Sequence, residues 1–188
     1  MFNDRYGLTQ AVIEGRKTMT RRLVPWALTE QWMEFVSDAP SVGGVYVHES
    51  EKEFYEREAP RYKVGEVVAV AQSYNEVVRE FTSLALVPGS TNKMFVKAEL
   101  MPHRIRITGI KCERLQDISD EDCMKEGILG DEADLQYNKY EVYDIFGNSD
   151  DGFDTPREAF ASLIDKVSGR GAWAHNPWVV AYEFELVK

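Results

Sequence analysis

The sequence predicts an α+β protein in which a small mixed β-sheet or barrel carries flanking helices. Residues 104–115 and 178–187 alternate between polar and apolar side chains, which is typical of half-buried strands. Helical patterns separate the predicted strands at irregular intervals, and the chain has no internal repeat. This order does not fit a doubly wound parallel sheet. We therefore expect a single domain over residues 1–188.

The N-terminal part is expected to form a helix over residues 6–14 and a strand over residues 18–24. Gly15 follows the helix, at the position where a left-handed residue most often ends one. The β-branched residues after it favour a strand, and Pro25 ends that strand.

Two stretches are expected to be insertions rather than parts of the core. Residues 25–60 have few, clustered apolar side chains, with a short helix at 29–36 and a candidate strand at 45–48. Residues 129–155 are acidic, with tyrosines interspersed.

The rest of the chain is expected to supply most of the sheet and two helices. The expected strands lie at 67–70, 94–100, 104–115 and 178–187, and the expected helices at 120–126 and 156–167. Ile105 and Ile107 are expected to face inward. Ser119 and Asp122, three residues apart, resemble a capping box at the start of a helix.

The composition describes a globular chain. Of its 188 residues, 44% are hydrophobic and 12% aromatic, which is too rich in aromatic side chains for a disordered chain. No apolar run approaches the roughly 18 residues of a membrane span. The first residues lack the basic start and apolar run of a signal peptide. We expect a cytoplasmic protein with no membrane partner.

The charge balance is acidic, with 32 Asp and Glu against 22 Lys and Arg. It argues against a non-specific grip on long duplex DNA, because that grip requires many phosphates to be neutralised at once. A small basic pocket for a nucleoside, a nucleotide or a short single strand is compatible with it.

The cysteines and histidines indicate neither a metal nor a cofactor. Cys112 and Cys123 are eleven residues apart and are expected to be reduced packing residues. His48, His103 and His175 form no metal-ligand spacing with each other or with the cysteines.

Residues 15–22, Gly-Arg-Lys-Thr-Met-Thr-Arg-Arg, form a basic stretch in a chain whose formal net charge is -10. Arginine offers a planar fork for phosphate or carboxylate, and lysine is the cation whose pKa shifts most readily. Two interpretations are open. The stretch is a binding or catalytic site, or it is a solvated edge beside a helix C-terminus, where the helix dipole favours cations.

Four segments together resemble the ASCH domains of the PUA-like superfamily. Residues 14–22 resemble the family signature Gly-x-Lys-Thr-x-x-x-Arg, and residues 62–70 resemble the strand that follows it. Residues 115–128 are similar to the strand-to-helix passage of the larger, phage-associated branch, and residues 176–180 to its closing Asn-Pro-Trp strand. The resemblance covers about half of the chain, and the two expected insertions lie outside it.

The resemblance implies a small, partly open β-barrel with helices at its rim and a cleft beside the signature. The family is regarded as binding RNA or nucleotides, and one small bacterial branch removes the acetyl group from N4-acetylcytidine. That branch uses a lysine and a threonine of the signature and a glutamate on the later helix. By position these are Lys17, Thr20 and Glu126.

Amide hydrolysis by these residues would use Thr20 as the nucleophile and Lys17 as its base while the lysine is neutral. The neighbouring arginines lower the pKa of Lys17 by repulsion and a close Glu126 raises it, which leaves the balance open. Glu126 would handle the proton of the leaving amine or orient Lys17. Residues three apart point to opposite faces of a regular strand, so Lys17 and Thr20 converge only if the chain bends between them.

The expected ligand-binding residues are Arg16, Thr18, Arg21, Arg22 and Tyr74. Arg22 is a candidate for stabilising negative charge on a substrate or transition state. Tyr74 offers a stacking surface for a base. It ends the segment Ala-Gln-Ser-Tyr, which replaces the Arg-Glu-Thr-Trp usual in the phage branch, so a charge pair of those relatives is missing here.

Three functions are therefore open. The first is a binding protein for RNA, a nucleotide or a modified nucleoside, and the second is an amidohydrolase acting on N4-acylated cytosine nucleosides. The third is a phage or mobile-element accessory protein that binds a host protein through the aromatic, acidic insertions.

Overall fold

We describe the protein from a computed structural model, over residues 2, 4–42, 45–46, 48–77, 87–135, 138–144 and 152–187. Over these residues the elements, in chain order, are η1 (Asp4–Tyr6), α1 (Leu8–Ile13), β1 (Met19–Leu23), α2 (Trp26–Ser37), β2 (Ser41–Val42), β3 (Val45–Tyr46), α3 (Glu51–Glu58), β4 (Val67–Ala69), α4 (Tyr74–Val77), η3 (Ala98–Leu100), β5 (Arg104–Arg114), η4 (Leu115–Asp117), α5 (Asp120–Lys125), β6 (Leu129–Leu135), β7 (Asn138–Asp144), α6 (Pro156–Ser168), α7 (Ala172–His175) and β8 (Trp178–Val187).

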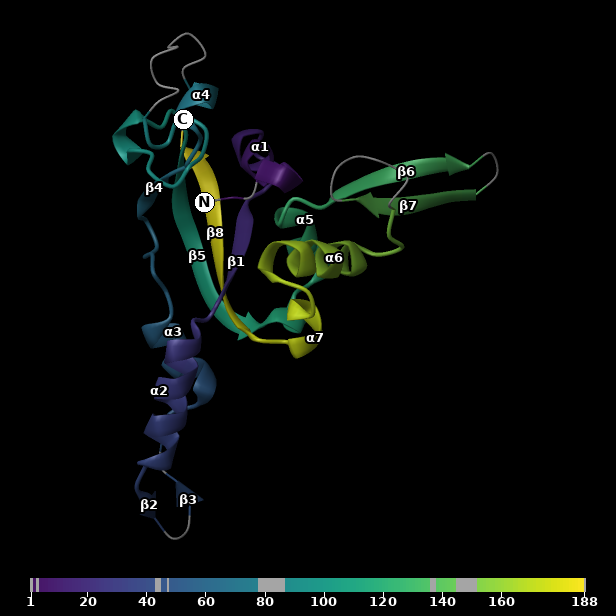
Figure 1. Ribbon diagram of the computed structural model, residues 1–188. Coiled ribbons are helices and arrows are strands. Elements are labelled where there is room, and N and C mark those ends of the chain that lie inside the picture. The colour runs from purple at the N-terminus through teal and green to yellow at the C-terminus, as the bar shows by residue number, and fades with distance from the viewer. Residues whose placement is uncertain are drawn as a thin grey trace.

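A four-stranded sheet in the order β1-β8-β5-β4 forms the centre of the molecule, and it curls into a half-barrel (Figure 1). The long strands β5 and β8 pair along most of their length, with β1 at one edge and β4 at the other. The α+β class is as expected. Each pairing among the described strands is antiparallel, so the expectation of a mixed sheet was wrong. Alternation in a sequence reports which face a residue occupies and not the direction of the neighbouring strand.

The two faces of this sheet have different chemistry. Residues directly opposite each other on paired strands point to the same face. We call one side the apolar face, and its buried members on β5 and β8 include Ile105, Ile107, Val180, Tyr182 and Phe184. The other side carries Val179, which packs with the helices α5 and α6, and we call it the α5 face.

A β-bulge interrupts β5 between Ile107 and Gly109. The extra residue changes which positions point to each face. Before the bulge, odd-numbered residues such as Ile107 lie on the apolar face. After it, Cys112 lies on the apolar face opposite Val180, and Lys111 lies on the α5 face opposite Ala181.

Local signals set the helix ends, and the cap by Ser119 was expected from its spacing with Asp122. The Ser119 side chain accepts a hydrogen bond from the Asp122 backbone N–H (3.1 Å), which caps α5. Gly127, with φ of 100°, follows that helix. Thr155 caps α6 in the same way, with Pro156 in its first turn. The helix expected at 6–14 is formed as the shorter α1, and the 3-10 turn η1 precedes it.

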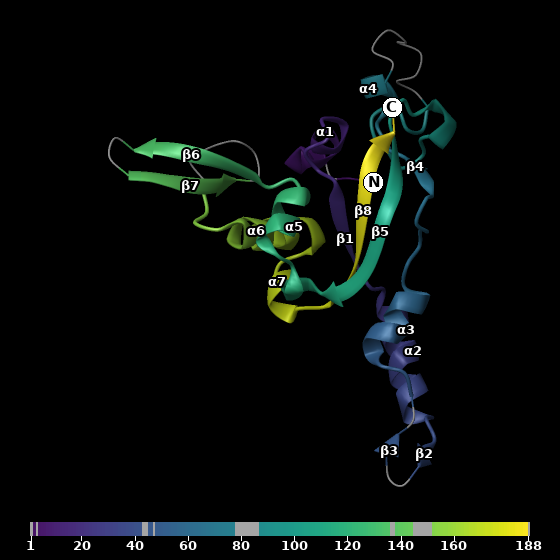
Figure 2. The same cartoon turned by 180° about the vertical axis from the view of Figure 1, so that it is seen from behind.

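Two parts of the chain project from the sheet in both views (Figures 1 and 2). The helices α2 and α3 form an arm with β2 and β3 at its tip, and Trp32 of α2 packs against Phe54 of α3 at 5.4 Å between ring centroids. The helix α2 is longer than the helix expected at 29–36. The hairpin β6–β7 projects beside α6.

The strand expected at 94–100 is not formed. Residues 94–97 are a turn and an extended link to η3, and both Met94 and Phe95 are exposed. The Lys97 backbone N–H donates to the Tyr74 hydroxyl (2.9 Å) instead of joining a strand ladder. The apolar side chains of this segment were not sufficient to predict a strand, because a strand also needs a neighbouring strand with which to pair. Among the described residues, no helix has the length and apolar character needed to span a membrane.

Candidate functional site

The basic stretch begins with a turn that fixes Lys17 ahead of the strand. Gly15 adopts a φ of 77° after α1. The Lys17 backbone N–H then donates to the Ala11 carbonyl, and the Thr18 N–H donates to the Lys125 carbonyl, both at 2.9 Å. Lys17 therefore precedes β1 and does not follow the alternation of strand residues.

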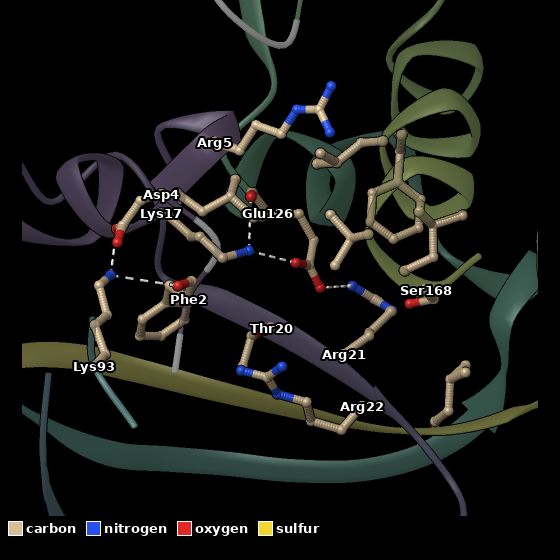
Figure 3. A pocket seen from close by; sticks show the side chains of 16 residues that line it. Phe2, Asp4, Arg5, Lys17, Thr20, Arg21, Arg22, Lys93, Glu126 and Ser168 are labelled. Atoms are coloured by element: carbon tan, nitrogen blue, oxygen red, sulfur yellow. Dashed lines mark hydrogen bonds and ion pairs between the residues drawn. The ribbon is translucent and has the colours of Figure 1, made fainter. Parts of the chain in front are cut away.

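The Lys17 side chain is buried, with 2% of its surface exposed. Its Nζ donates to Glu126 twice, at 2.5 Å to Oε2 and at 2.7 Å to the backbone carbonyl (Figure 3). Burial lowers the pKa of Lys17 because it disfavours the charged form. The Glu126 carboxylate opposes this effect, and the net direction is downward. At a given pH, a larger fraction of Lys17 is therefore in the neutral amine form than of an ordinary lysine.

Arg21 is also buried, on the α5 face. Its Nε and one terminal nitrogen donate to Glu113 Oε1 at 2.9 and 2.6 Å, and that nitrogen also donates to Asp122 Oδ2 at 2.9 Å. The other terminal nitrogen contacts Glu126 Oε1 and Met19 Sδ, both at 3.1 Å. An arginine has five N–H donors, so all five have partners within the protein. A ligand can be bound by Arg21 only if one of these contacts is broken.

The contacts continue from Arg21 toward solvent. Lys111 donates to Asp122 Oδ2 at 2.8 Å and lies 3.1 Å from Glu113 Oε2, and 46% of its side chain is exposed. Burial alone would lower the pKa of Arg21, but the surrounding carboxylates outweigh burial and raise it. We use the name buried charge cluster for the six residues Lys17, Arg21, Lys111, Glu113, Asp122 and Glu126.

A cavity of about 670 Å³, here called the main cavity, lies between β1, α6 and the N-terminal segment (Figure 3). Lys17, Thr20 and Glu126 all border it, and Lys17 contacts Glu126. Its cationic lining residues are Arg5, Lys17, Arg21, Arg22 and Lys93, and its acidic ones are Asp4 and Glu126.

A second cavity of about 360 Å³ lies on the apolar face of the sheet, and we call it the aromatic cavity. Phe2, Thr20, Arg22 and Leu23 border both cavities, so the two meet at β1. Its other lining residues are Pro25, Ala59, Arg61, Tyr62, Val68, Ala69, Ala71, Ile105, Ile107, Val180, Tyr182 and Phe184.

The register of β1 determines which of its side chains point to each face of the sheet. Thr20 lies opposite Tyr182 and Arg22 opposite Val180, so both point to the apolar face. Arg21 lies opposite Ala181 and points to the α5 face. Lys17 borders the main cavity as Thr20 does, because it lies in the turn before the strand and does not follow the alternation of β1.

Three expected ligand residues lie elsewhere. Arg16 is exposed and pairs with Glu14 at 2.6 Å. The Thr18 backbone is bonded to α5 and β8. Tyr74 is buried, and its hydroxyl accepts from the Lys97 backbone. None of the three is among the described residues that line the main or the aromatic cavity.

Sequence reasoning missed Lys111 and Glu113 and assigned Asp122 only a capping role. A signal for the first two exists, because a lysine and a glutamate two residues apart on a strand share a face. It does not reveal that Arg21 lies on the same face, which depends on the strand register.

Within the described residues, no group of three or more His, Cys, Asp and Glu side chains is placed to hold a metal ion. Cys112 and Cys123 are buried free cysteines. Burial raises the pKa of the Cys112 thiol to about 11 and that of the Cys123 thiol to about 12. Their thiolates are therefore scarce at neutral pH.

Comparisons with protein-family models, with curated proteins and with solved structures find no match for this chain. Assignment to a family therefore remains a proposal, and function has to be inferred from the cavities and from the buried charge cluster.

Proposed function

We propose that the protein is a PUA-like ASCH protein that binds a nucleoside, a nucleotide or a short RNA segment in the main cavity. One observation carries this proposal. Among the described residues, five cationic side chains and two carboxylates line the main cavity, in a chain whose net charge is -10. The curled sheet with flanking helices, and a cavity beside residues 15–22, agree with what the family resemblance implies.

The cations of the main cavity differ in their surroundings. Lys17 and Arg21 bond carboxylates of the buried charge cluster, and Lys93 contacts Asp4 and the Thr9 hydroxyl. Arg5 and Arg22 are the exposed cations of the lining. With few exposed cations among its described lining residues, the cavity suits one phosphate or a short strand rather than a long polyanion.

The aromatic cavity adds a surface suited to a base. Tyr62 and Tyr182 pack edge to face with ring centroids 5.5 Å apart, and both border this cavity. Arg22 borders both cavities, with its guanidinium carbon 6.0 Å from the centre of the Phe2 ring. Aromatic faces beside a guanidinium are the usual means of holding an unstacked base or a nucleoside.

Calorimetric titration with cytidine, cytidine monophosphate and a short single-stranded RNA tests the binding proposal. We expect the monophosphate and the RNA to bind more weakly as salt rises from about 50 to about 200 mM, and cytidine to be less affected. Of the three ligands, the monophosphate should lose the most affinity in Arg22→Met. Arg106→Met is the matched control, because Arg106 is exposed and pairs with Glu185 outside both cavities. Equal effects of the two variants would contradict the proposal.

A second candidate function is hydrolysis of N4-acylated cytosine nucleosides. The observation that favours it is the burial of Lys17 against Glu126 beside the same cavity as Thr20. A lysine whose pKa is lowered by burial is suited to act as a base.

In this reaction neutral Lys17 takes the hydroxyl proton of Thr20 while the oxygen attacks the carbonyl carbon. The carbon–nitrogen bond then breaks, and the leaving amine takes a proton from the Lys17 ammonium, which Glu126 holds in place. Water next attacks the threonyl ester and gives a proton to Lys17. The carbon–oxygen bond to Thr20 breaks, its oxygen recovers a proton, and a carboxylic acid leaves.

Release of cytidine from N4-acetylcytidine tests this second function. We expect Lys17→Met to lower the rate by about 10²–10⁴-fold, the usual contribution of a positioned acid or base. Lys125→Met is a matched control. Lys125 is the last residue of α5, next to Glu126, but it is not among the described residues that line the main cavity. The hydrolysis proposal fails if nothing is released, or if Lys17→Met matches the control.

A further inference from the structure

The main and aromatic cavities meet at Thr20, and the residues that move protons lie on only one side of it. Lys17 and Glu126 border the main cavity and are not among the described residues that line the aromatic cavity. Thr20 borders both, because it lies on the edge strand β1 and points to the apolar face opposite Tyr182. A substrate bond held at Thr20 therefore has a distinct chemical environment on each side.

This asymmetry orients an amide substrate. The carbonyl carbon has to lie beside the Thr20 oxygen that attacks it. The leaving nitrogen has to lie on the side of the groups that protonate it, which are in the main cavity. The acyl substituent is on the opposite side of the carbonyl carbon from that nitrogen. It therefore points into the aromatic cavity, so in the hydrolysis reaction this cavity holds the acyl group and the main cavity holds the nucleoside.

The aromatic cavity is larger and more apolar than an acetyl group needs. Its volume of about 360 Å³ falls in the range of pockets that hold ligands of drug size. Among its walls, Ile105, Ile107 and Phe184 are buried core residues. An acetyl methyl would leave most of this space unfilled and its walls without contacts, whereas a ring would be packed on several sides.

Among its described lining residues, the aromatic cavity has one charged residue besides Arg22, namely Arg61, which is exposed and has its guanidinium carbon 5.8 Å from the centre of the Tyr62 ring. Other polar groups of the cavity lie where an amide, rather than the end of an acyl chain, would need them. The Tyr182 hydroxyl accepts from the Arg61 backbone N–H at 2.8 Å, so this polar atom has a partner within the protein. The Thr20 hydroxyl and Arg22 lie at the junction with the main cavity. The Tyr62 and Tyr182 rings offer the edge-to-face packing that aromatic groups prefer.

We propose that the aromatic cavity is the acyl-group subsite, and that the preferred substrates carry a bulky apolar or aromatic acyl group, such as benzoyl, on the exocyclic amine. This inference rests on the amide hydrolysis proposed above. The acyl group passes from the amine nitrogen to the Thr20 oxygen and then to water, so that one amide and one water give one amine and one carboxylic acid.

Comparison of kcat/KM for N4-acetyl-, N4-butanoyl- and N4-benzoylcytidine tests the subsite. Each rate is divided by the hydroxide-catalysed rate of the same compound, which removes differences in intrinsic reactivity. We expect about a fourfold gain for each additional buried CH₂ group, as apolar burial provides. The benzoyl compound should then exceed the acetyl compound by at least about tenfold.

Variants that fill the aromatic cavity localise the effect. Ala71→Leu and Ala59→Leu add side chain at two different walls, which keeps the test decisive if one of them fails to fold. Each should lower kcat/KM for the benzoyl compound by about tenfold or more while changing that for the acetyl compound by less than about threefold. Ala27→Leu, on the exposed surface of α2, is the matched control.

The outcomes separate the two proposals. Hydrolysis of the acetyl compound without a preference for larger acyl groups would overturn the subsite and leave the hydrolysis intact. Equal effects of the filling variants on all three compounds would do the same. Absence of turnover for all three compounds would overturn both.

Discussion

Arg21 and Arg22 are adjacent residues of the same type with opposite surroundings. All five donors of Arg21 have partners on the α5 face, three of them the carboxylates of Glu113, Asp122 and Glu126. Arg22 is exposed, points to the apolar face and borders both cavities. The difference shows that the basic stretch is not a uniform patch. Strand alternation places one arginine in the buried charge cluster and the other at the junction of the two cavities.

The comparison also separates effects on the free energy of unfolding from effects on ligand binding. Removing one partner of a buried ion pair leaves an uncompensated charge in a poorly hydrated place. Removing an exposed cation changes stability little and acts mainly on what binds nearby. The predictions below begin with the buried side of β1, where the largest effect is expected.

Replacing Arg21 by methionine is expected to cost about 3–5 kcal/mol of unfolding free energy, because three buried carboxylates lose their shared partner. Urea unfolding followed by circular dichroism measures this loss. Arg106→Met, which removes a surface pair with Glu185, should cost less than about 1 kcal/mol. Similar losses in the two variants would remove the distinction between the faces of β1.

The second prediction concerns Lys17, which is linked to Arg21 through Glu126. Because burial lowers the pKa of Lys17, kcat/KM for amide hydrolysis should rise with pH and level off below the ordinary lysine value of 10.5. Below the plateau the slope should be about tenfold per pH unit. Glu126→Gln removes the carboxylate that favours the ammonium form, so the plateau should begin at lower pH. A shift to higher pH would contradict this account.

Arg22 provides the opposite case. Arg22→Met should leave the unfolding free energy within about 0.5 kcal/mol of the wild-type value. It should weaken the binding of cytidine monophosphate by about tenfold, because a contact between a cation and a phosphate is lost. Cytidine, which has no phosphate, serves as the control ligand. A stability loss comparable to that of Arg21→Met would mean that the two arginines are not divided as described.

The smallest effect is expected from acid titration of Asp122. Burial opposes its ionisation, but hydrogen bonds from Lys111 and Arg21 outweigh burial and lower the pKa of Asp122 below its ordinary value of 3.8. A carboxylate with a lowered pKa stabilises the fold above that ordinary value, and the contribution is lost as pH falls through the folded value.

The stability difference between the wild type and Asp122→Asn should therefore shrink below pH 3.8, by at most about 1.4 kcal/mol per pH unit. Urea unfolding at several acidic pH values measures it. Glu121→Gln, exposed on the same helix, is the control and should show a weaker dependence. A difference that is constant with pH would mean that Asp122 does not titrate as described.

The elements with strong local signals were predictable from the sequence. The strand β8 has the bounds expected from its alternation, and Ser119 caps α5 as its spacing with Asp122 indicated. Gly15 ends the first helical segment in a left-handed conformation, as expected. These features depend on neighbours within a few residues, which is the range over which one sequence is informative.

Features that depend on distant partners were not predictable. Residues 94–97 look like a strand but lie beside Tyr74, whose hydroxyl takes the Lys97 donor. The inward orientation of Arg21 depends on the pairing of β1 with β8, and the position of Lys111 on the same face depends on the pairing of β8 with β5. Registers of this kind are set by tertiary packing, and residue types alone do not encode them.

The bulge in β5 has a consequence for how this chain can change in evolution. Thr108 is the residue that β5 has in excess over β8 between Ile107 and Gly109. Loss of its codon would leave Ile107 opposite Phe184 and the next residue opposite Glu183, which is a regular ladder. Lys111 and Glu113 would then keep the α5 face, and Cys112 would keep the apolar face. Homologous chains are therefore expected to vary in length within β5 mainly at the bulge, because an insertion or deletion elsewhere moves the residues beyond it to the other face.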